Sequence, residues 1–213
     1  MLAFLPGVAL SQGPASSAAT FQSGGKPIRA EVSYPATSGR HPAVLVLYGG
    51  LGMTLRPAGY RHYAADLAKQ GYSAFLVHYF DRTSEEKLGE NYGPKLELWL
   101  STIHDAIGFV AKDSKVDPKR IGVVGFSLSA GLALEAAAQD RRIKAISEYY
   151  GGLGDDFPKS VTRMPPVLIL QGDADTGIPV SHVFDANGDT PEGIDAWQRT
   201  LAFFDRYLSK SPK

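Results

Sequence analysis

Short, uninterrupted apolar segments alternate with longer amphipathic segments along most of this chain, and this alternation restricts the possible folds more than any other feature. Residues 42–48 (PAVLVLY) and 72–79 (YSAFLVHY) are typical of strands that are buried on both faces of a sheet. Strands alternating with helices predict an α/β fold with a mostly parallel central sheet and helices on both faces. The other predicted strands are 28–34, 120–126, 143–150 and 166–171, and the predicted helices are 57–70, a long helix from about 94, 128–139 and 191–208.

The N-terminal segment does not follow this pattern. We expect residues 1–25 to lie outside a single domain that comprises residues 26–213. Residues 2–10 are apolar and are followed by small and polar residues, as in the later part of a secretory signal peptide, but no Lys or Arg follows Met1. Two interpretations stay open, a loosely packed arm or the remnant of a signal peptide, so both a cytoplasmic and an exported protein are compatible with the sequence.

Composition excludes several classes of partner and cofactor. Lys plus Arg and Asp plus Glu number 22 each, so no basic excess attracts nucleic acid or an anionic membrane, and we expect neither as a partner. The absence of cysteine excludes disulfides, thiolate metal sites and a cysteine nucleophile. No metal-ligand spacing is present, and we expect no metal or cofactor. The oligomeric state is left open.

The strongest chemical signal is Gly125-Phe126-Ser127-Leu128-Ser129, which connects a predicted buried strand to an Ala-rich helix. A serine at such a turn is held in a strained conformation that exposes its hydroxyl above the sheet, as a nucleophile requires. The flanking positions must be small, and Ser129 stands where glycine is usual. The alternative is that Ser127 simply caps the helix.

Two backbone N–H groups are candidates for an oxyanion hole. Leu128 opens the predicted helix, where free N–H groups favour a developing negative charge. The glycine-rich loop Tyr48-Gly49-Gly50-Leu51-Gly52 follows the strand 42–48, and we predict the second donor to be the N–H of Gly50, with Leu51 next in order. A plain tight turn would explain these glycines equally well.

A catalytic triad also needs a carboxylate and an imidazole. Asp173 and Asp175 both follow the strand 166–171, where a triad carboxylate is expected. His182 comes after them and completes the chain order Ser…Asp…His, with His78 as the reserve candidate. The other histidines lie before a strand or within predicted helices: His41, His62 and His104.

On these residues the chain resembles the dienelactone hydrolase family, which implies an α/β-hydrolase fold. The resemblance covers roughly residues 26–208 and rests on PAVLVLYGGLG, DPKRIGVVGFSLSAG, PPVLILQGDADTGIPV and DAWQRTLAFFDRYL. The family pattern G-x-x-D-x-x-[VI]-P implies that Asp175 is the triad carboxylate. A small residue and Phe commonly follow the family histidine, which fits His182-Val183-Phe184.

The sequence departs from the family at three points. The namesake enzymes have a cysteine nucleophile where Ser127 stands and a glutamate where Gly49 stands, so the chain is more similar to serine esterase-like members. Only six residues separate Asp175 from His182, whereas family members place about 25 to 30 there, including a strand that presents the histidine. Seven peptide steps still span about 24 Å, so the side chains could meet. Either the connection is genuinely short or the sequence lacks a segment.

We therefore predict a serine hydrolase that cleaves a small carboxylic ester or lactone through an acyl-enzyme intermediate. The alternative is a catalytically impaired hydrolase-fold domain that serves in binding or interaction. A peptidase or acyltransferase with the same triad also stays open. Six side chains near strand ends could line an aromatic pocket or belong to the core: His78, Tyr79, Phe80, Trp99, Tyr149 and Tyr150.

Overall fold

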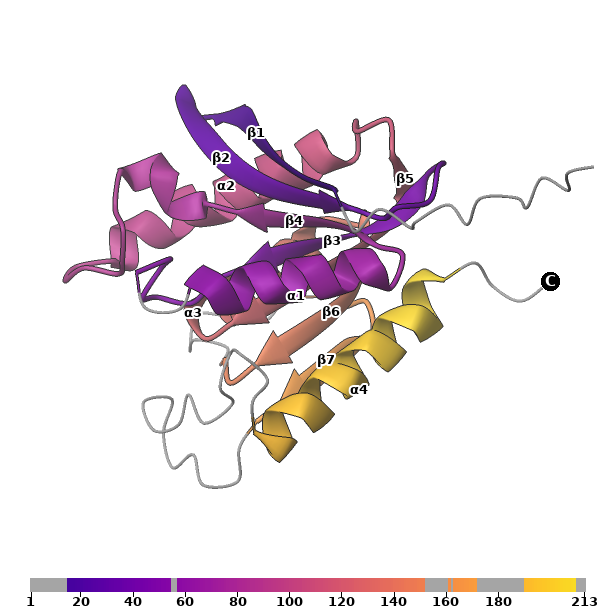
Figure 1. Cartoon of the computed structure of the whole chain (residues 1–213). Coiled ribbons are helices and arrows are strands. Elements are labelled where there is room, and N and C mark those ends of the chain that lie inside the picture. Colours follow the sequence, from indigo (N-terminus) through magenta and orange to yellow (C-terminus); the bar gives the residue numbers. More distant parts are fainter. Residues whose placement is uncertain (1–14, 55–56, 152–160, 162, 172–189, 210–213) are drawn as a thin grey trace, which may run out of the picture.

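A seven-stranded sheet forms the centre of the protein (Figure 1). This computed structural model describes residues 15–54, 57–151, 161, 163–171 and 190–209. The strand order in the described part of the chain is β1-β2-β4-β3-β5-β6-β7. The strands are β1 (Ala15–Ser23), β2 (Lys26–Tyr34), β3 (His41–Leu47), β4 (Ser73–Val77), β5 (Val116–Phe126), β6 (Ile143–Tyr149) and β7 (Val167–Leu170).

The sheet is parallel where the predicted nucleophile lies. The strands β4, β3, β5, β6 and β7 pair in parallel, whereas β1 pairs with β2 and β2 with β4 in antiparallel fashion. The carboxyl ends of the five parallel strands therefore lie along one edge, where ligands bind in folds of this kind. This arrangement confirms the predicted mostly parallel α/β sheet of an α/β hydrolase.

Four α-helices cover the two faces of the sheet in the described part of the chain. The helices α1 (Pro57–Lys69) and α4 (Pro191–Leu208) lie on the face toward the viewer in Figure 1, and α2 (Gly93–Val110) and α3 (Leu128–Gln139) lie on the other. A short 3₁₀ helix, η1 (Tyr79–Thr83), follows β4. The rings of Tyr63 on α1 and Trp197 on α4 join the two helices of one face, with centroids 4.4 Å apart.

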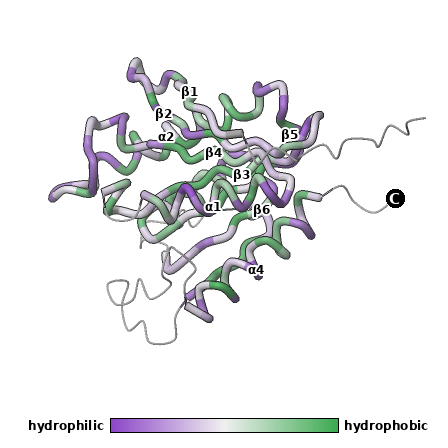
Figure 2. The backbone as a smooth tube through the Cα atoms, in the orientation of Figure 1, coloured by the Kyte–Doolittle hydropathy of each residue, from purple (hydrophilic) through white to green (hydrophobic). Residues whose placement is uncertain are grey.

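Local chemistry explains where these elements begin and end. The strands β3 and β4 are buried along nearly their whole length, as their continuous apolar runs predict, and apolar colouring marks the central strands in Figure 2. The helix α4 begins after Thr190, whose hydroxyl accepts a hydrogen bond from the Gly193 N–H, and Pro191 occupies the first helical position. The bounds predicted for α3 and α4 are confirmed.

The expected boundary at residue 25 is wrong for the part of the N-terminal segment that the structure describes. Residues 15–23 form β1, which pairs along its whole length with β2. Gly24 and Gly25 connect the two strands with positive φ angles of 49° and 76°, which glycine adopts without strain. Phe21 is the strand's single large apolar residue, and it stacks on Phe109 of α2 at 5.2 Å. Residues 1–14 lie outside the described residues.

The strand β5 begins at Val116, four residues before the predicted start at residue 120. The register between β3 and β5 shifts between His41 and Ala43, so the additional residues of β5 form an irregularity of the ladder. At the other end of the parallel sheet, β7 is the last described strand, and Ile169 is 65% exposed there.

None of the described helices is both long and apolar enough to cross a membrane.

Candidate active site

Ser127 lies at a sharp junction between β5, which ends at Phe126, and α3, which begins at Leu128. Its φ and ψ angles are 52° and −117°, a conformation that costs a non-glycine residue on the order of 1–3 kcal/mol. The Ser127 side chain makes no capping hydrogen bond to α3 and is only partly buried. The structure therefore has the strained turn that the sequence predicts and does not support a capping role for the hydroxyl.

Backbone hydrogen bonds hold this strained residue in place. The Ser127 N–H donates to the Tyr149 carbonyl at the end of β6, with an N–O distance of 2.9 Å. The Ser127 carbonyl accepts from the Ala130 N–H, also at 2.9 Å. The junction is fixed on both sides, so the side chain of Ser127 remains available for chemistry.

Ser129 has a role in this junction that the sequence analysis missed. Its fully buried hydroxyl accepts from the Phe126 N–H at 2.9 Å and donates to the Leu47 carbonyl at 2.6 Å. The hydroxyl therefore ties the end of β5 to the end of β3. A Cβ at Gly125 would lie only 2.7 Å from the Ser129 carbonyl oxygen, which explains the small residue there.

The glycine-rich loop after β3 touches the same junction. A Cβ added at Gly49 would lie 3.4 Å from the Cβ of Ser127 and 3.2 Å from the Phe126 carbonyl oxygen. The backbone of Gly49 therefore packs directly against the junction, with little room for a side chain. The Gly49 N–H donates to the Tyr60 hydroxyl at 3.1 Å, and the Gly50 carbonyl accepts from the Leu88 N–H. The N–H of Gly50 thus belongs to a loop that packs against Ser127, as an oxyanion donor must.

The candidates for acid and base from the C-terminal half cannot be placed against Ser127. Asp173, Asp175 and His182 lie outside the described residues. The strand that precedes them, β7, is parallel to β6, and β6 is parallel to β5. The carboxyl end of β7 therefore lies on the same edge of the sheet as Ser127, and the chain enters the undescribed segment 172–189 from that edge.

The reserve base His78 has partners elsewhere. Its Nε2 lies 3.0 Å from Oε1 of Glu31, which also binds the Arg61 guanidinium. Burial lowers the pKa of His78, while the Arg61 hydrogen bond lowers the pKa of the Glu31 carboxyl. The strand β3 separates β4, which ends before His78, from the Ser127 junction. His78 is thus hydrogen-bonded within a cluster with Glu31 and Arg61, and a strand lies between the end of β4 and the Ser127 junction.

The remaining described histidines are engaged away from the junction. His41 lies 3.0 Å from the Thr37 carbonyl, His62 pairs with Asp66 on α1, and His104 lies near Gln139 and Asp140. Of the two alternatives for the six side chains near strand ends, the structure favours the core, because all six are buried. They are His78, Tyr79, Phe80, Trp99, Tyr149 and Tyr150.

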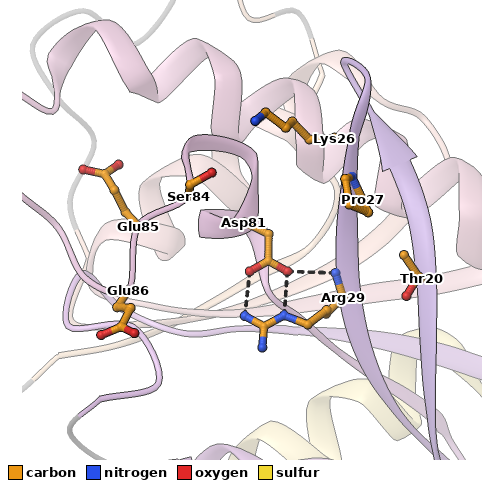
Figure 3. A pocket seen from close by; sticks show the side chains of 8 residues that line it. All are labelled: Thr20, Lys26, Pro27, Arg29, Asp81, Ser84, Glu85 and Glu86. Atoms are coloured by element: carbon orange, nitrogen blue, oxygen red, sulfur yellow. Dashed lines mark hydrogen bonds and ion pairs between the residues drawn. The ribbon is translucent and has the colours of Figure 1, made fainter.

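Two cavities lie to one side of the junction, around an Arg29–Asp81 ion pair. One has a volume of about 510 Å³ and is drawn in Figure 3, and the other has about 280 Å³. Asp81 accepts from the Arg29 backbone N–H at 2.9 Å and from its guanidinium at 2.9 and 2.7 Å. Neither cavity is lined by Ser127, so we locate the candidate site by the junction. The described residues contain no group of three or more side chains that could hold a metal ion.

Glu148 is a further polar residue near the junction that no sequence pattern signals. It is only 2% exposed and lies at the end of β6, beside the strand that carries Ser127. Burial raises the pKa of this carboxyl to about 7, partly offset by a hydrogen bond from the Gly151 N–H. Perturbed carboxyls of this kind gather at functional sites, so Glu148 belongs to the description of the junction.

Comparisons with known proteins identify the family of the chain. The model of the dienelactone hydrolase family matches residues 28–192. A "Putative carboxymethylenebutenolidase" of Methylorubrum extorquens is 27% identical over 167 residues, which cover 70% of this chain and 56% of the relative. A "Probable 2-oxo-3-(5-oxofuran-2-ylidene)propanoate lactonase" of a Bradyrhizobium species is 28% identical over 194 residues, which cover 86% of this chain and 72% of the relative.

Solved structures of dienelactone hydrolases have a similar fold. A dienelactone hydrolase from Anabaena variabilis superposes with a TM-score of 0.68 at 17% identity, covering 92% of this chain and 100% of that structure. A structure named "m3DLH" superposes with a TM-score of 0.75 at 18% identity, covering 93% and 100%. The chain spans only about half the length of some curated relatives, such as the first one named above.

Proposed function

Because the chain belongs to the dienelactone hydrolase family, we propose that it hydrolyses a small carboxylic ester or lactone and that Ser127 is its nucleophile. One observation carries the assignment. Ser127 combines a strained backbone, a partly exposed side chain and the absence of a capping hydrogen bond, at the edge of the sheet where ligands bind. A strained backbone conformation that is not accompanied by a stabilising side-chain hydrogen bond is typical of functional residues.

The mechanism is acyl transfer through an acyl-enzyme. The Ser127 Oγ attacks the ester carbonyl while His182, oriented by Asp175, accepts the hydroxyl proton. The N–H groups of Leu128 and Gly50 stabilise the oxyanion, and His182 then returns the proton to the leaving alkoxide. Water, activated by the same imidazole, hydrolyses the acyl-enzyme and regenerates the Ser127 hydroxyl.

The substrate class follows from the family and the relatives together. The family is named for hydrolysis of a dienelactone, and the Bradyrhizobium relative is named as a lactonase. A lactone is an internal ester, so both reactions use the same attack on a carbonyl. A serine nucleophile attacks the carbonyl of an open-chain ester in the same way, so both classes belong to the proposal.

Hydrolysis of p-nitrophenyl acetate and butyrate tests the proposal. We expect Ser127→Ala to lower kcat/KM at least ~10⁴-fold, since the nucleophile is removed while the fold is retained. Ser101→Ala, at an exposed position of α2, is the matched control and keeps wild-type activity. Equal rates for wild type and Ser127→Ala would remove Ser127 from the mechanism.

A panel of small esters and lactones distinguishes the alternative, a hydrolase-fold domain without catalysis. Only six residues lie between Asp175 and His182, which is the observation that favours it. A wild-type protein that is folded and inert toward the whole panel would support this alternative and contradict the hydrolase proposal.

A further inference from the structure

Glu148 is a carboxyl that the mechanism above does not use, although it is buried beside the nucleophile. In the sheet it stands next to Gly125 of β5 on one side and Ile169 of β7 on the other. Its neighbours Ser147 and Tyr149 hydrogen-bond Thr200 of α4. Since side chains alternate along a strand, Glu148 points to the opposite face, which α3 covers.

Gly151, two residues after β6, lies between the Glu148 carboxyl and the first turn of α3. The Gly151 N–H donates to Oε1 of Glu148 at an N–O distance of 2.5 Å. A Cβ added at Gly151 would lie 2.6 Å from this Oε1, 3.0 Å from the Ser127 carbonyl oxygen and 2.3 Å from the Cβ of Ala130. Both oxygens, Oε1 of Glu148 and the Ser127 carbonyl oxygen, are thus close to the same point at Gly151, and the carboxyl lies near the backbone of the nucleophile.

Between Glu148 and Gly151 the backbone is strained. Tyr150 has a φ of 40°, a left-handed value that is unfavourable for an aromatic residue. Its N–H donates to the Leu170 carbonyl, and its ring packs toward Phe126 with centroids 6.2 Å apart. The Glu148 carboxyl closes this turn from the other side. A second strained residue is thus held directly next to the strained nucleophile.

Among the residues that the structure describes, no charged partner explains the burial of the carboxyl. Oε2 of Glu148 has no hydrogen-bond partner among the described residues. On α3 the titratable residue is Glu135, eight positions after Ser127, and β7 has none. The charged residues of β5 lie toward its start, and those of α4 lie across the sheet. They are Asp117, Lys119 and Arg120 on β5, and Glu192, Asp195, Arg199, Asp205 and Arg206 on α4.

We propose that Glu148 is a positioning residue of the hydrolytic site: its buried carboxyl fixes the Tyr150–Gly151 turn against the first turn of α3 and so forms the wall of the site on the β6 side. The inference rests on the proposed function. The carboxyl acts in its uncharged form. Ionisation places a negative charge beside Gly151 and the Ser127 carbonyl, at the start of α3, and in a poorly solvated site this charge opposes the developing charge of the oxyanion.

The pH dependence of kcat and KM for p-nitrophenyl butyrate tests the proposal. In wild type we expect kcat to fall about tenfold from about pH 7 to about pH 9 as Glu148 ionises, with KM nearly constant, because the charge acts on the transition state. Glu148→Gln keeps the acceptor for Gly151 and cannot ionise, so its kcat stays level over this range. Glu135→Gln is the matched control and keeps the decline.

A second variant separates the two consequences of losing the carboxyl. Glu148→Ala removes both the charge and the hydrogen bond to Gly151, so it also lacks the alkaline decline but has a lower kcat at every pH. A purely structural role would lower activity without changing the shape of the profile.

Several results would overturn the proposal. A Glu148→Gln profile that parallels wild type would do so while leaving the Ser127 mechanism intact. A wild-type profile that stays flat at alkaline pH would have the same meaning, whether or not either variant folds. A wild-type protein that hydrolyses no ester at any pH would instead contradict the proposed function, and this inference with it.

Discussion

The carboxyl ends of β4 and of β5–β6 lie on the same edge of the sheet, but the charged groups near them differ in how they are paired. Beyond β4, charges are paired: Arg61 binds Glu31 at 2.6 Å, Glu31 also binds His78, and Arg29 binds Asp81 at 2.7 Å. At β5 and β6, Ser127 and Tyr150 have strained φ angles, and Glu148 has a buried oxygen without a partner among the described residues.

This difference indicates which of the two regions does chemistry. Paired charges lower the energy of the folded state without preparing any group to react, so the cluster at β4 stabilises structure. Ser84, after β4, also has a positive φ, but it ends a 3₁₀ helix in the ordinary left-handed region, whereas Ser127 has a φ of 52° and a ψ of −117° between a strand and a helix. Strain of the second kind raises the energy of the folded state and is typical of functional residues. The β5–β6 end is therefore the proposed active site, even though Ser127 lines neither of the two cavities around Arg29 and Asp81.

Substitution of the serine in one region should lower kcat/KM far more than substitution of the histidine in the other. Ser127→Ala is expected to lower kcat/KM at least ~10⁴-fold. His78→Gln should retain more than about a third of wild-type kcat/KM, since His78 binds Glu31 and does not take a proton in the reaction. Both variants are assayed with p-nitrophenyl butyrate. If His78→Gln lost activity as completely as Ser127→Ala, the reserve assignment of His78 as the base would have to be restored.

The second effect is on stability and concerns the buried carboxyl. The Glu148 pKa is about 7 in the folded protein, against 4.5 for an ordinary glutamate, so the folded state keeps this proton to higher pH than the unfolded state. Its contribution is therefore complete below about pH 4.5 and is lost as the pH rises through about 7. We expect the free energy of unfolding of wild type to fall by roughly 3 kcal/mol relative to Glu148→Gln over this range.

Urea unfolding of the two proteins at several pH values measures this difference. The comparison cancels the other titrating groups, which both proteins share. A difference that is constant with pH would show that the buried carboxyl titrates normally, and the contrast between the two regions would be weakened.

A smaller loss is expected for Ser129→Ala. The substitution leaves the Phe126 N–H and the Leu47 carbonyl without their buried partner, which costs about 2 kcal/mol. The urea midpoint should fall accordingly, while exposed Ser101→Ala leaves it unchanged. An unchanged midpoint in Ser129→Ala would mean that the hydroxyl does not tie β5 to β3.

The smallest effect is expected at the paired charges. Arg61 is 54% exposed, so Arg61→Ala should cost less than about 1 kcal/mol, and the cost should shrink in about 1 M salt. Thermal unfolding at low and high salt checks this. A large cost that did not depend on salt would make the β4 cluster more than a surface network.

The sequence predicted those parts of the fold that depend on long apolar runs and on the strand–helix junction. The strands β3 and β4 and the helices α3 and α4 appear where their hydrophobic patterns place them, and the turn at Ser127 has the expected strain. These elements are predictable because the hydrophobic pattern within each segment determines which of its side chains are buried.

It failed where structure depends on partners distant in sequence. The strand β1 has one large apolar residue and is held by pairing with β2, which hydrophobic periodicity does not record. Glu148 lies in an apolar strand, and nothing in the sequence signals that its carboxyl is buried with no charged partner among the described residues. The Ser129 hydroxyl bonds Leu47, which lies on another strand of the sheet. The predicted roles of Asp175 and His182 fall outside the described residues and stay predictions.

An activated Ser127 hydroxyl is the central claim, and covalent labelling tests it most directly. The protein is treated with a fluorophosphonate, which reacts with activated serines, and peptide mass spectrometry locates the adduct. We predict a single adduct on Ser127 in wild type and none in Ser127→Ala, with labelling retained in Ser101→Ala. A folded wild-type protein that stays unlabelled, or one labelled at another serine, would contradict the account.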